Sequence, residues 1–178
     1  MYIVAEILSI IQYLETLKDK SKFYRLAKCL CCGNANPWLH GCYSRKADRS
    51  GAGEVSLNPV RIQRFFCPNC GRTCSVLPEF IPPNRWYPWD VQQAALLLLL
   101  VGESCRAVEN KITPSRHTIR RWFNRFREQF SFHKDTLCNH FAELGRAANF
   151  TEFWLSCLNA MPLSKAMRLC HASGVPVP

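Results

Sequence analysis

Cys67-Pro68-Asn69-Cys70-Gly71 repeats the pattern of an earlier stretch, Cys29-Leu30-Cys31-Cys32-Gly33, and this repeat decides the fold of the first part of the chain. In each stretch, two cysteines three positions apart are followed directly by glycine. Two thiolates from one tight turn can bind the same metal ion, and four thiolates complete a tetrahedral Zn²⁺ site with bonds of about 2.3 Å. Glycine suits its position because the chain turns away from the metal there, often with a positive φ. We therefore predict a structural Zn²⁺ site formed by Cys29, Cys32, Cys67 and Cys70.

The other cysteines need an explanation, because the chain has 11 in its 178 residues. Chance alone gives about 0.6 pairs at this spacing, but two pairs that are each followed by glycine are a coincidence of roughly one in 500. Cys31 could compete as a ligand, although only Cys29 with Cys32 has the right interval before Gly33. Buried free cysteines are ordinary core residues, and we interpret six others in this way: Cys42, Cys74, Cys105, Cys138, Cys157 and Cys170. We interpret His40 as a strand residue rather than as a ligand.

The insert between the two cysteine pairs is long, with 34 residues between Cys32 and Cys67. Doubling a closed loop costs only about 0.6 kcal/mol, whereas structural zinc contributes roughly 10 kcal/mol or more. The pattern predicts strands over Trp38 to Arg45 and Val60 to Phe66, with a turn-rich segment from Ala47 to Asn58 between them. A hairpin of this kind would bring the two pairs together.

The formal net charge is +10, and the excess lies in the middle of the chain. Residues 91 to 132 contain 7 Arg or Lys against 3 acids, whereas residues 133 to 178 contain 4 against 3. Such an excess favours a polyanionic partner. The apolar start is interrupted by Glu6 and Glu15 and is a poor signal peptide, and the apolar run at 96 to 101 is too short to span a bilayer. We expect no membrane association and a cytoplasmic, reducing, nucleoid-associated location.

The predicted fold is mainly α with a small β zinc ribbon. Apolar residues near helical spacing from Tyr2 to Leu17 predict an amphipathic helix, and prolines near residues 80 to 88 indicate a boundary. The predicted segments are an N-terminal amphipathic helix at 1–28, a zinc ribbon at 29–80, a helix-turn-helix at 88–132 and a C-terminal helical appendage at 133–178. The apolar appendage either completes the core, which we favour, or forms a homodimer.

The helix-turn-helix prediction is based on start and stop signals. Asp90 is a plausible N-cap and Gly102 a plausible end of an apolar helix over Asp90 to Val101. Ser104 can cap a short helix over Cys105 to Lys111, and Pro114 disfavours helical geometry just before Ser115. Ser115 then caps a long helix from Arg116 to about Phe130. A short helix, a turn and a long helix are the layout of a helix-turn-helix.

The long helix separates into an apolar face and a cationic face when it is projected at 100° per residue. The apolar face consists of Ile119, Trp122, Phe123, Phe126 and Phe130. Arg pairs with guanine or phosphate and Asn with adenine, so the N-terminal part of the helix suits a major groove. We predict base contacts from Arg116, His117, Arg120 and Asn124, and phosphate contacts from Arg121, Arg125 and Arg127.

The order of these motifs resembles the zinc-ribbon plus helix-turn-helix proteins of bacterial insertion sequences, the InsA-like regulators and the N-terminal DNA-binding regions of related transposases. The resemblance covers about residues 29 to 127, and its most specific parts are Cys67 to Thr73 and the helix start Cys105-Arg106-Ala107. It implies a zinc-dependent protein that binds double-stranded DNA in transposition or transcription regulation. It also implies a separate transposase as a candidate partner.

The sequence also bears on three other classes of function. A zinc-ribbon adaptor that holds a partner protein in a nucleoprotein complex is the alternative. RNA binding is less favoured because the deep, narrow major groove of A-form RNA does not admit a helix. An enzyme is not expected, since the residues after Phe132 contain only the acids Asp135, Glu143 and Glu152 and no recognisable catalytic motif.

Overall fold

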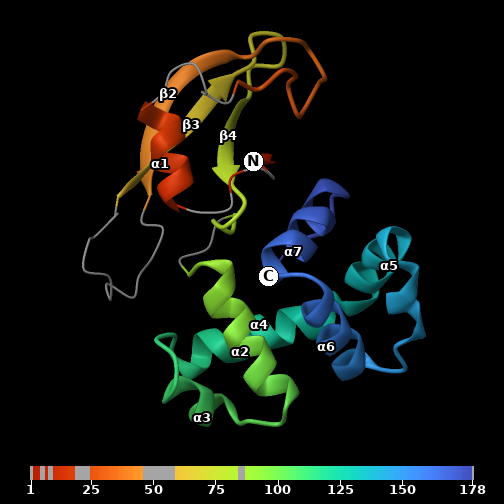
Figure 1. The fold of residues 1–178 in the computed structure, drawn as a ribbon. Coiled ribbons are helices and arrows are strands. Elements are labelled where there is room, and N and C mark those ends of the chain that lie inside the picture. The colour runs from red at the N-terminus through yellow and green to blue at the C-terminus, as the bar shows by residue number, and fades with distance from the viewer. Residues whose placement is uncertain are drawn as a thin grey trace. The chain divides into compact units, whose positions relative to one another are not determined.

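The computed structural model describes residues 2–4, 7, 10–18, 25–45, 59–83 and 87–177. The chain forms two compact units, residues 1–86 and 87–178 (Figure 1). The boundary between them lies within the range 80–88 that the prolines indicate. The first unit is built on a sheet and the second on helices, so the fold as a whole is mixed rather than mainly α.

The sheet of the first unit has four strands: β1 (Tyr2–Val4), β2 (Trp38–Arg45), β3 (Val60–Phe66) and β4 (Thr73–Pro78). Their order is β1-β4-β3-β2, with β2, β3 and β4 antiparallel and β1 parallel to β4. The bounds of β2 and β3 are those that the sequence predicts, which confirms the hairpin. The predicted turn at 47–58 lies outside the described residues.

The predicted N-terminal helix is wrong in its first part. Tyr2–Val4 forms β1 on the edge of β4, and helix α1 covers only Ile10–Lys18. A Tyr-Ile-Val run favours a strand because aromatic and β-branched side chains fit a pleated surface. The segment 1–28 is also not a separate element, because Ile7, Tyr13 and Leu26 are buried in one core with sheet residues such as Ile62 and Leu77.

The second unit contains helices α2 (Trp89–Leu100), α3 (Cys105–Glu109), α4 (Arg116–Glu128), α5 (Phe130–His140), α6 (Phe150–Ala160) and α7 (Leu163–Ala172), with a 3₁₀ segment at Ala142–Arg146. The predicted division at residue 132 is absent, because Leu96 of α2 and Phe126 of α4 share one buried cluster with Trp154 of α6 and Met167 of α7. The tail therefore completes the core of this unit. Buried Cys157 and Cys170 belong to the same cluster, which confirms their interpretation as core residues.

Helix α2 begins one residue earlier than predicted. Pro88 occupies its N-cap, and the Asp90 carboxylate instead accepts a hydrogen bond from the Val91 N–H at 2.9 Å. Proline before the first turn is favourable because no backbone donor is lost and its φ is fixed near the helical value. Gly102 ends the helix with a φ of 96°, as predicted. No helix among the described residues is long and apolar enough to cross a membrane.

Candidate metal centre and cationic helix

The two cysteine turns have the same backbone geometry. In the first turn the Cys29 N–H donates to Asn34 O at 2.8 Å and the Gly33 N–H donates to Cys29 O at 2.9 Å. In the second turn the Cys67 N–H donates to Arg72 O and the Gly71 N–H donates to Cys67 O, both at 2.9 Å. Gly33 and Gly71 have φ values of 71° and 67°, a region that favours glycine. The sequence interpretation of these two glycines is confirmed.

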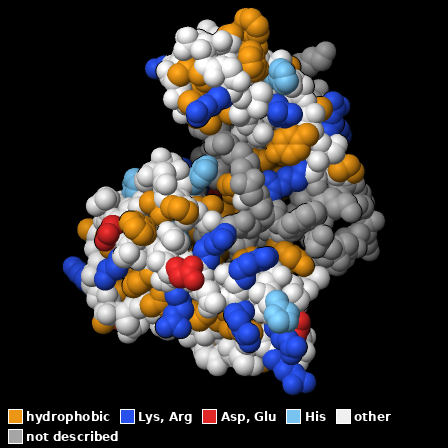
Figure 2. Space-filling model, turned by 180° about the vertical axis from the view of Figure 1, so that it is seen from behind, with side chains coloured by type: hydrophobic (Ala, Val, Ile, Leu, Met, Phe, Trp, Pro, Cys, Tyr) orange, Lys and Arg blue, Asp and Glu red, His pale blue; other side chains and the backbone are white. Residues whose placement is uncertain are grey.

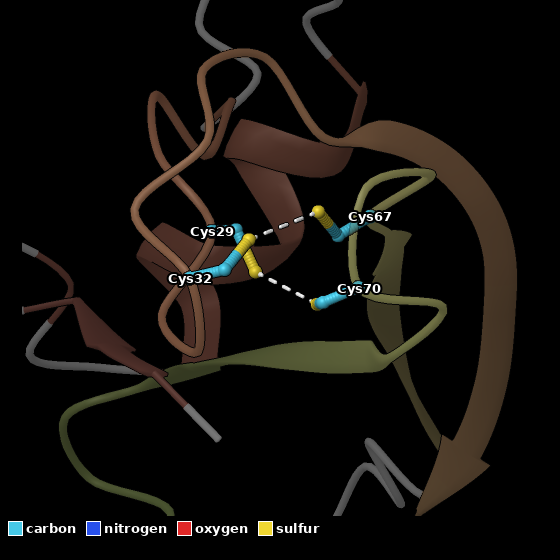
Figure 3. A group of neighbouring side chains, drawn as sticks. All are labelled: Cys29, Cys32, Cys67 and Cys70. Carbon is cyan, nitrogen blue, oxygen red and sulfur yellow. Dashed lines mark hydrogen bonds between the residues drawn. The ribbon is translucent and has the colours of Figure 1, made fainter.

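The four predicted ligands converge on one point. The sulfur atoms of Cys29, Cys32, Cys67 and Cys70 all lie within 4.8 Å of one another, and Figure 3 shows their side chains pointing toward each other from the two turns. The Sγ atoms of Cys29 and Cys70 are 3.7 Å apart, and those of Cys32 and Cys67 are 3.6 Å apart. A tetrahedral ion with metal–sulfur bonds of about 2.3 Å requires sulfur separations of about 3.8 Å. The cluster is therefore compatible with a four-thiolate metal site.

Hydrogen bonds to the sulfur atoms favour the thiolate forms in the first turn. The Asn69 side-chain N–H lies 3.5 Å from Cys32 Sγ, and this contact together with the Asn34 N–H lowers the pKa of Cys32 to about 6. The backbone N–H groups of Cys32 and Cys31 lower the pKa of Cys29. The thiolate form of Cys32 is thus favoured near neutral pH before any metal is bound, and that of Cys29 is favoured relative to a free cysteine.

Cys70 shows the opposite behaviour. The Arg72 N–H acts to lower the pKa of the Cys70 thiol, but desolvation and the neighbouring thiols outweigh it and raise the pKa to about 12. Clustered thiols resist ionising together because like charges repel. Metal binding removes these protons, so the metal-free cluster is expected to retain protons that a bound cation would release.

The other sulfur and imidazole groups near the cluster do not take part in it. Cys31, which could compete as a ligand on sequence grounds, is exposed and lies outside the four-residue group. Cys42 instead accepts hydrogen bonds from the Arg61 guanidinium at 2.9 and 3.2 Å. The His40 ring packs against Phe66, as expected for a strand residue.

Helix α4 has the two faces that the sequence predicts. Ile119, Trp122 and Phe126 are buried. On the opposite side, residues at positions 117, 120, 121, 124, 125 and 128 form one stripe that lines a shallow surface hollow of about 280 Å³. The stripe consists of His117, Arg120, Arg121, Asn124, Arg125 and Glu128, and all of these are exposed except the half-buried Arg125. We call this set the α4 stripe.

Two of the predicted DNA-contacting residues lie beside the stripe rather than in it. Arg116 is exposed at the start of the helix. The Arg127 guanidinium lies 5.9 Å from the centre of the Phe123 ring. Within the described part of the chain, none of the five α4 arginines forms an ion pair. Their charge is therefore available to a partner, and Figure 2 shows Lys and Arg side chains gathered on the surface of the helical unit with fewer acidic ones.

The start of α4 is held by a contact that the sequence interpretation missed. Ser115 occupies the N-cap but makes no capping hydrogen bond, and its hydroxyl lies 3.3 Å from that of Thr118. The Arg116 N–H donates instead to the Glu109 carboxylate of α3 at 2.9 Å. Val108, Ile119 and Trp122 share a buried cluster that connects α3 with α4. The short helix thus positions the first turn of the long one.

We expect Glu109→Ala to destabilise the helical unit by about 1 kcal/mol, because it removes both a cap and a negative charge at a helix N-terminus. Glu128→Ala is the matched control, since it removes the same charge from the other end of α4, where an acid is unfavourable. Urea unfolding monitored at the helical circular dichroism signal measures both variants. Equal stability of wild type and Glu109→Ala would contradict the capping role.

The fold and the site define a class of protein with a four-cysteine centre on a small sheet, followed by a helical unit that exposes a cationic helix. The family described as a domain of unknown function, DUF6431, matches residues 29–122. This is more than half of the chain, and the chain belongs to this family. The match begins at the first cluster cysteine and ends within α4, so it includes all four cysteines and α3. No curated protein and no solved structure matches the chain.

Proposed function

We propose that the protein is a zinc-dependent double-stranded DNA-binding protein in which α4 is the recognition helix. The observation that carries this proposal is the α4 stripe: an exposed row of Arg, His and Asn side chains on a helix whose other face is buried. A helix fits the major groove of B-DNA, where Arg pairs with guanine and Asn with adenine. Phosphates also favour a surface with unpaired cationic groups.

Zinc is the proposed metal. Tetrahedral sites with four sulfur ligands take zinc or iron, and four thiolates leave no open position for a substrate or water. The sulfur separations of 3.6 and 3.7 Å fit a tetrahedral site of four sulfur ligands. When bound, the ion would cross-link the turns before β2 and β4, so its role would be structural.

A helix-turn-helix is the proposed arrangement of α3 and α4. Its support is the short helix, the turn at 110–115 and the 13-residue second helix, with a buried contact between the two helices. The turn contains Pro114, which is buried. In such a unit the N-terminal residues of the second helix reach the base edges. We therefore propose that Arg116 and His117 contact bases.

The biological setting is proposed from the resemblance to InsA-like regulators and transposase N-terminal regions. The proposed role is association with transposition or regulation of transcription at the nucleoid, without a catalytic centre in this chain. A separate transposase is the proposed protein partner. The adaptor function is not favoured by any specific feature of the α4 stripe, because a cationic helix suits a polyanion better than a protein surface.

A titration of labelled duplex DNA with the zinc-loaded full chain at two salt concentrations tests this function. The affinity is expected to fall steeply as salt rises, with a log–log slope of about −0.9 for each phosphate contacted. Absence of binding at low salt, together with a nuclease-resistant complex with another protein, would contradict DNA binding and favour an adaptor.

A further inference from the structure

The sheet unit carries three aromatic rings where β2 begins and β3 ends, of which Trp38 and His40 are exposed and Phe66 is half-buried. Trp38 and Phe66 are directly opposite each other in the β2–β3 pair, so their side chains lie on the same face of the sheet. The His40 ring centre is 5.6 Å from that of Phe66, with the rings inclined at 36°. The Trp38 side chain is 62% exposed although tryptophan is among the most apolar residues. We call Trp38, His40 and Phe66 the aromatic platform.

Basic groups flank this platform. Arg64 lies two residues before Phe66 on the same strand and therefore on the same face. Its guanidinium donates to the Thr73 hydroxyl at 3.2 Å, and Thr73 is the residue of β4 opposite Phe66. Arg72, the residue directly before Thr73, is exposed. Arg64 therefore borders the platform on the side of β4, and Arg72 is an exposed basic residue next to Thr73.

Basic residues outnumber acidic ones in the two described segments that carry β2, β3 and β4. Within the described residues 25–45 and 59–83, Glu79 is the sole acid, and it is buried. The same ranges contain six basic residues: Arg25, Lys28, Arg45, Arg61, Arg64 and Arg72. Figure 2 shows hydrophobic side chains beside Lys, Arg and His side chains on the sheet unit. An exposed tryptophan ring with an arginine on the same face suits a partner that combines flat apolar groups with negative charge.

The platform is also fixed in place by the cysteine turns. Phe66 directly precedes Cys67, whose N–H donates to Arg72 O at 2.9 Å and closes the second turn. Because Arg72 and Thr73 follow that turn directly, the ring and its flanking groups are held by the same backbone geometry that gathers the sulfur atoms. A preorganised surface loses little conformational entropy on binding.

We propose that the aromatic platform binds single-stranded nucleic acid, with an unpaired base stacked on Trp38 and neighbouring phosphates held by Arg64 and Arg72. Stacking on exposed aromatic rings combined with cationic groups along the backbone is how unpaired strands are held without sequence readout. A purely apolar protein partner fits less well, because the rings are bordered by charges. This inference does not depend on duplex binding by α4, which belongs to the other unit.

The test compares two oligonucleotides of about 15 nucleotides, a length that spans one binding site. One is oligo-dT and the other has the same phosphates but abasic sugars, and each is titrated with the zinc-loaded full chain by fluorescence anisotropy. The wild type is expected to bind oligo-dT about tenfold more tightly than the abasic strand. Trp38→Ala is expected to remove this difference, and Trp38→Phe to retain most of it.

Leu39→Ala is the matched control. Leu39 is 59% exposed and adjacent to Trp38, but it is opposite Phe65 on the other face of the sheet, so its removal is expected to leave both affinities unchanged. Arg120→Ala is likewise expected to leave the preference for oligo-dT unchanged, which separates this inference from duplex binding.

Equal affinity of the wild type for the two strands would overturn the inference. So would a preference for oligo-dT that survives Trp38→Ala. If Trp38→Ala instead converts a dimer to a monomer in light scattering while oligo-dT binding is unchanged, the platform is a contact between protein chains and the inference is wrong.

Discussion

Cys67→Ser is expected to unfold the sheet unit while the helical unit remains folded. Structural zinc contributes on the order of 10 kcal/mol, which is comparable to the entire stability of a small domain, about 5–15 kcal/mol. Serine cannot replace a buried thiolate ligand, and Cys67 is only 1% exposed. The helical unit has its own buried clusters, so its stability does not depend on the metal.

Hydrogen exchange resolved by peptide measures this outcome, because it reports the two units separately. Protection is expected to be lost in β2, β3 and β4 and kept in α2, α4 and α6. Cys31→Ser is the matched control, since Cys31 lies between two ligands but outside the cluster, and it should behave as wild type. A Cys67→Ser protein with a protected sheet would show that the cluster does not hold the unit together.

Arg120→Ala is expected to weaken duplex binding about tenfold or more without changing the fold. Arg120 is exposed in the middle of the α4 stripe, and a bidentate contact to a base contributes about 1–3 kcal/mol of discrimination. Removing an arginine that contacts a phosphate should in addition make the log–log salt dependence of the affinity shallower by about 1. Arg121 is one of the residues that we predict to contact a phosphate. Arg121→Ala should therefore weaken binding to all sequences equally.

Arg146→Ala is the control for net charge. Arg146 is exposed in the 3₁₀ segment after α5, so this variant loses the same charge away from α4. Anisotropy titrations of one duplex at several salt concentrations compare the three variants with wild type. If Arg146→Ala weakens binding as much as Arg120→Ala, the effect is one of total charge and α4 has no special role.

The parts of the structure that depend on local pattern were predictable from the sequence. The bounds of β2 and β3 follow from aromatic and β-branched runs between turn residues, and the convergence of four cysteines follows from the repeated spacing with glycine. The two faces of α4 follow from its helical period. The signal for each of these features lies within a few neighbouring residues, even where, as with the cysteines, the two halves of the feature are far apart in the sequence.

The parts that depend on distant partners were not predictable. Tyr2–Val4 is a strand because β4, more than 70 residues later, offers an edge to pair with. Glu109 caps α4 across a turn, where Ser115 has the better local propensity. The C-terminal helices pack with α2 and α4 because Leu96, Phe126 and Trp154 are buried in one cluster. Trp38 is exposed on β2, which is an edge strand.

The metal content of the full chain, measured by native mass spectrometry on protein purified without added zinc, tests the four-cysteine site most directly. We expect one Zn²⁺ per chain in the wild type and none in Cys67→Ser, with the four cysteines protected from alkylation only when the ion is bound. A folded wild-type chain that carries no metal, and whose four cysteines react freely, would show that the cluster is not a structural zinc site.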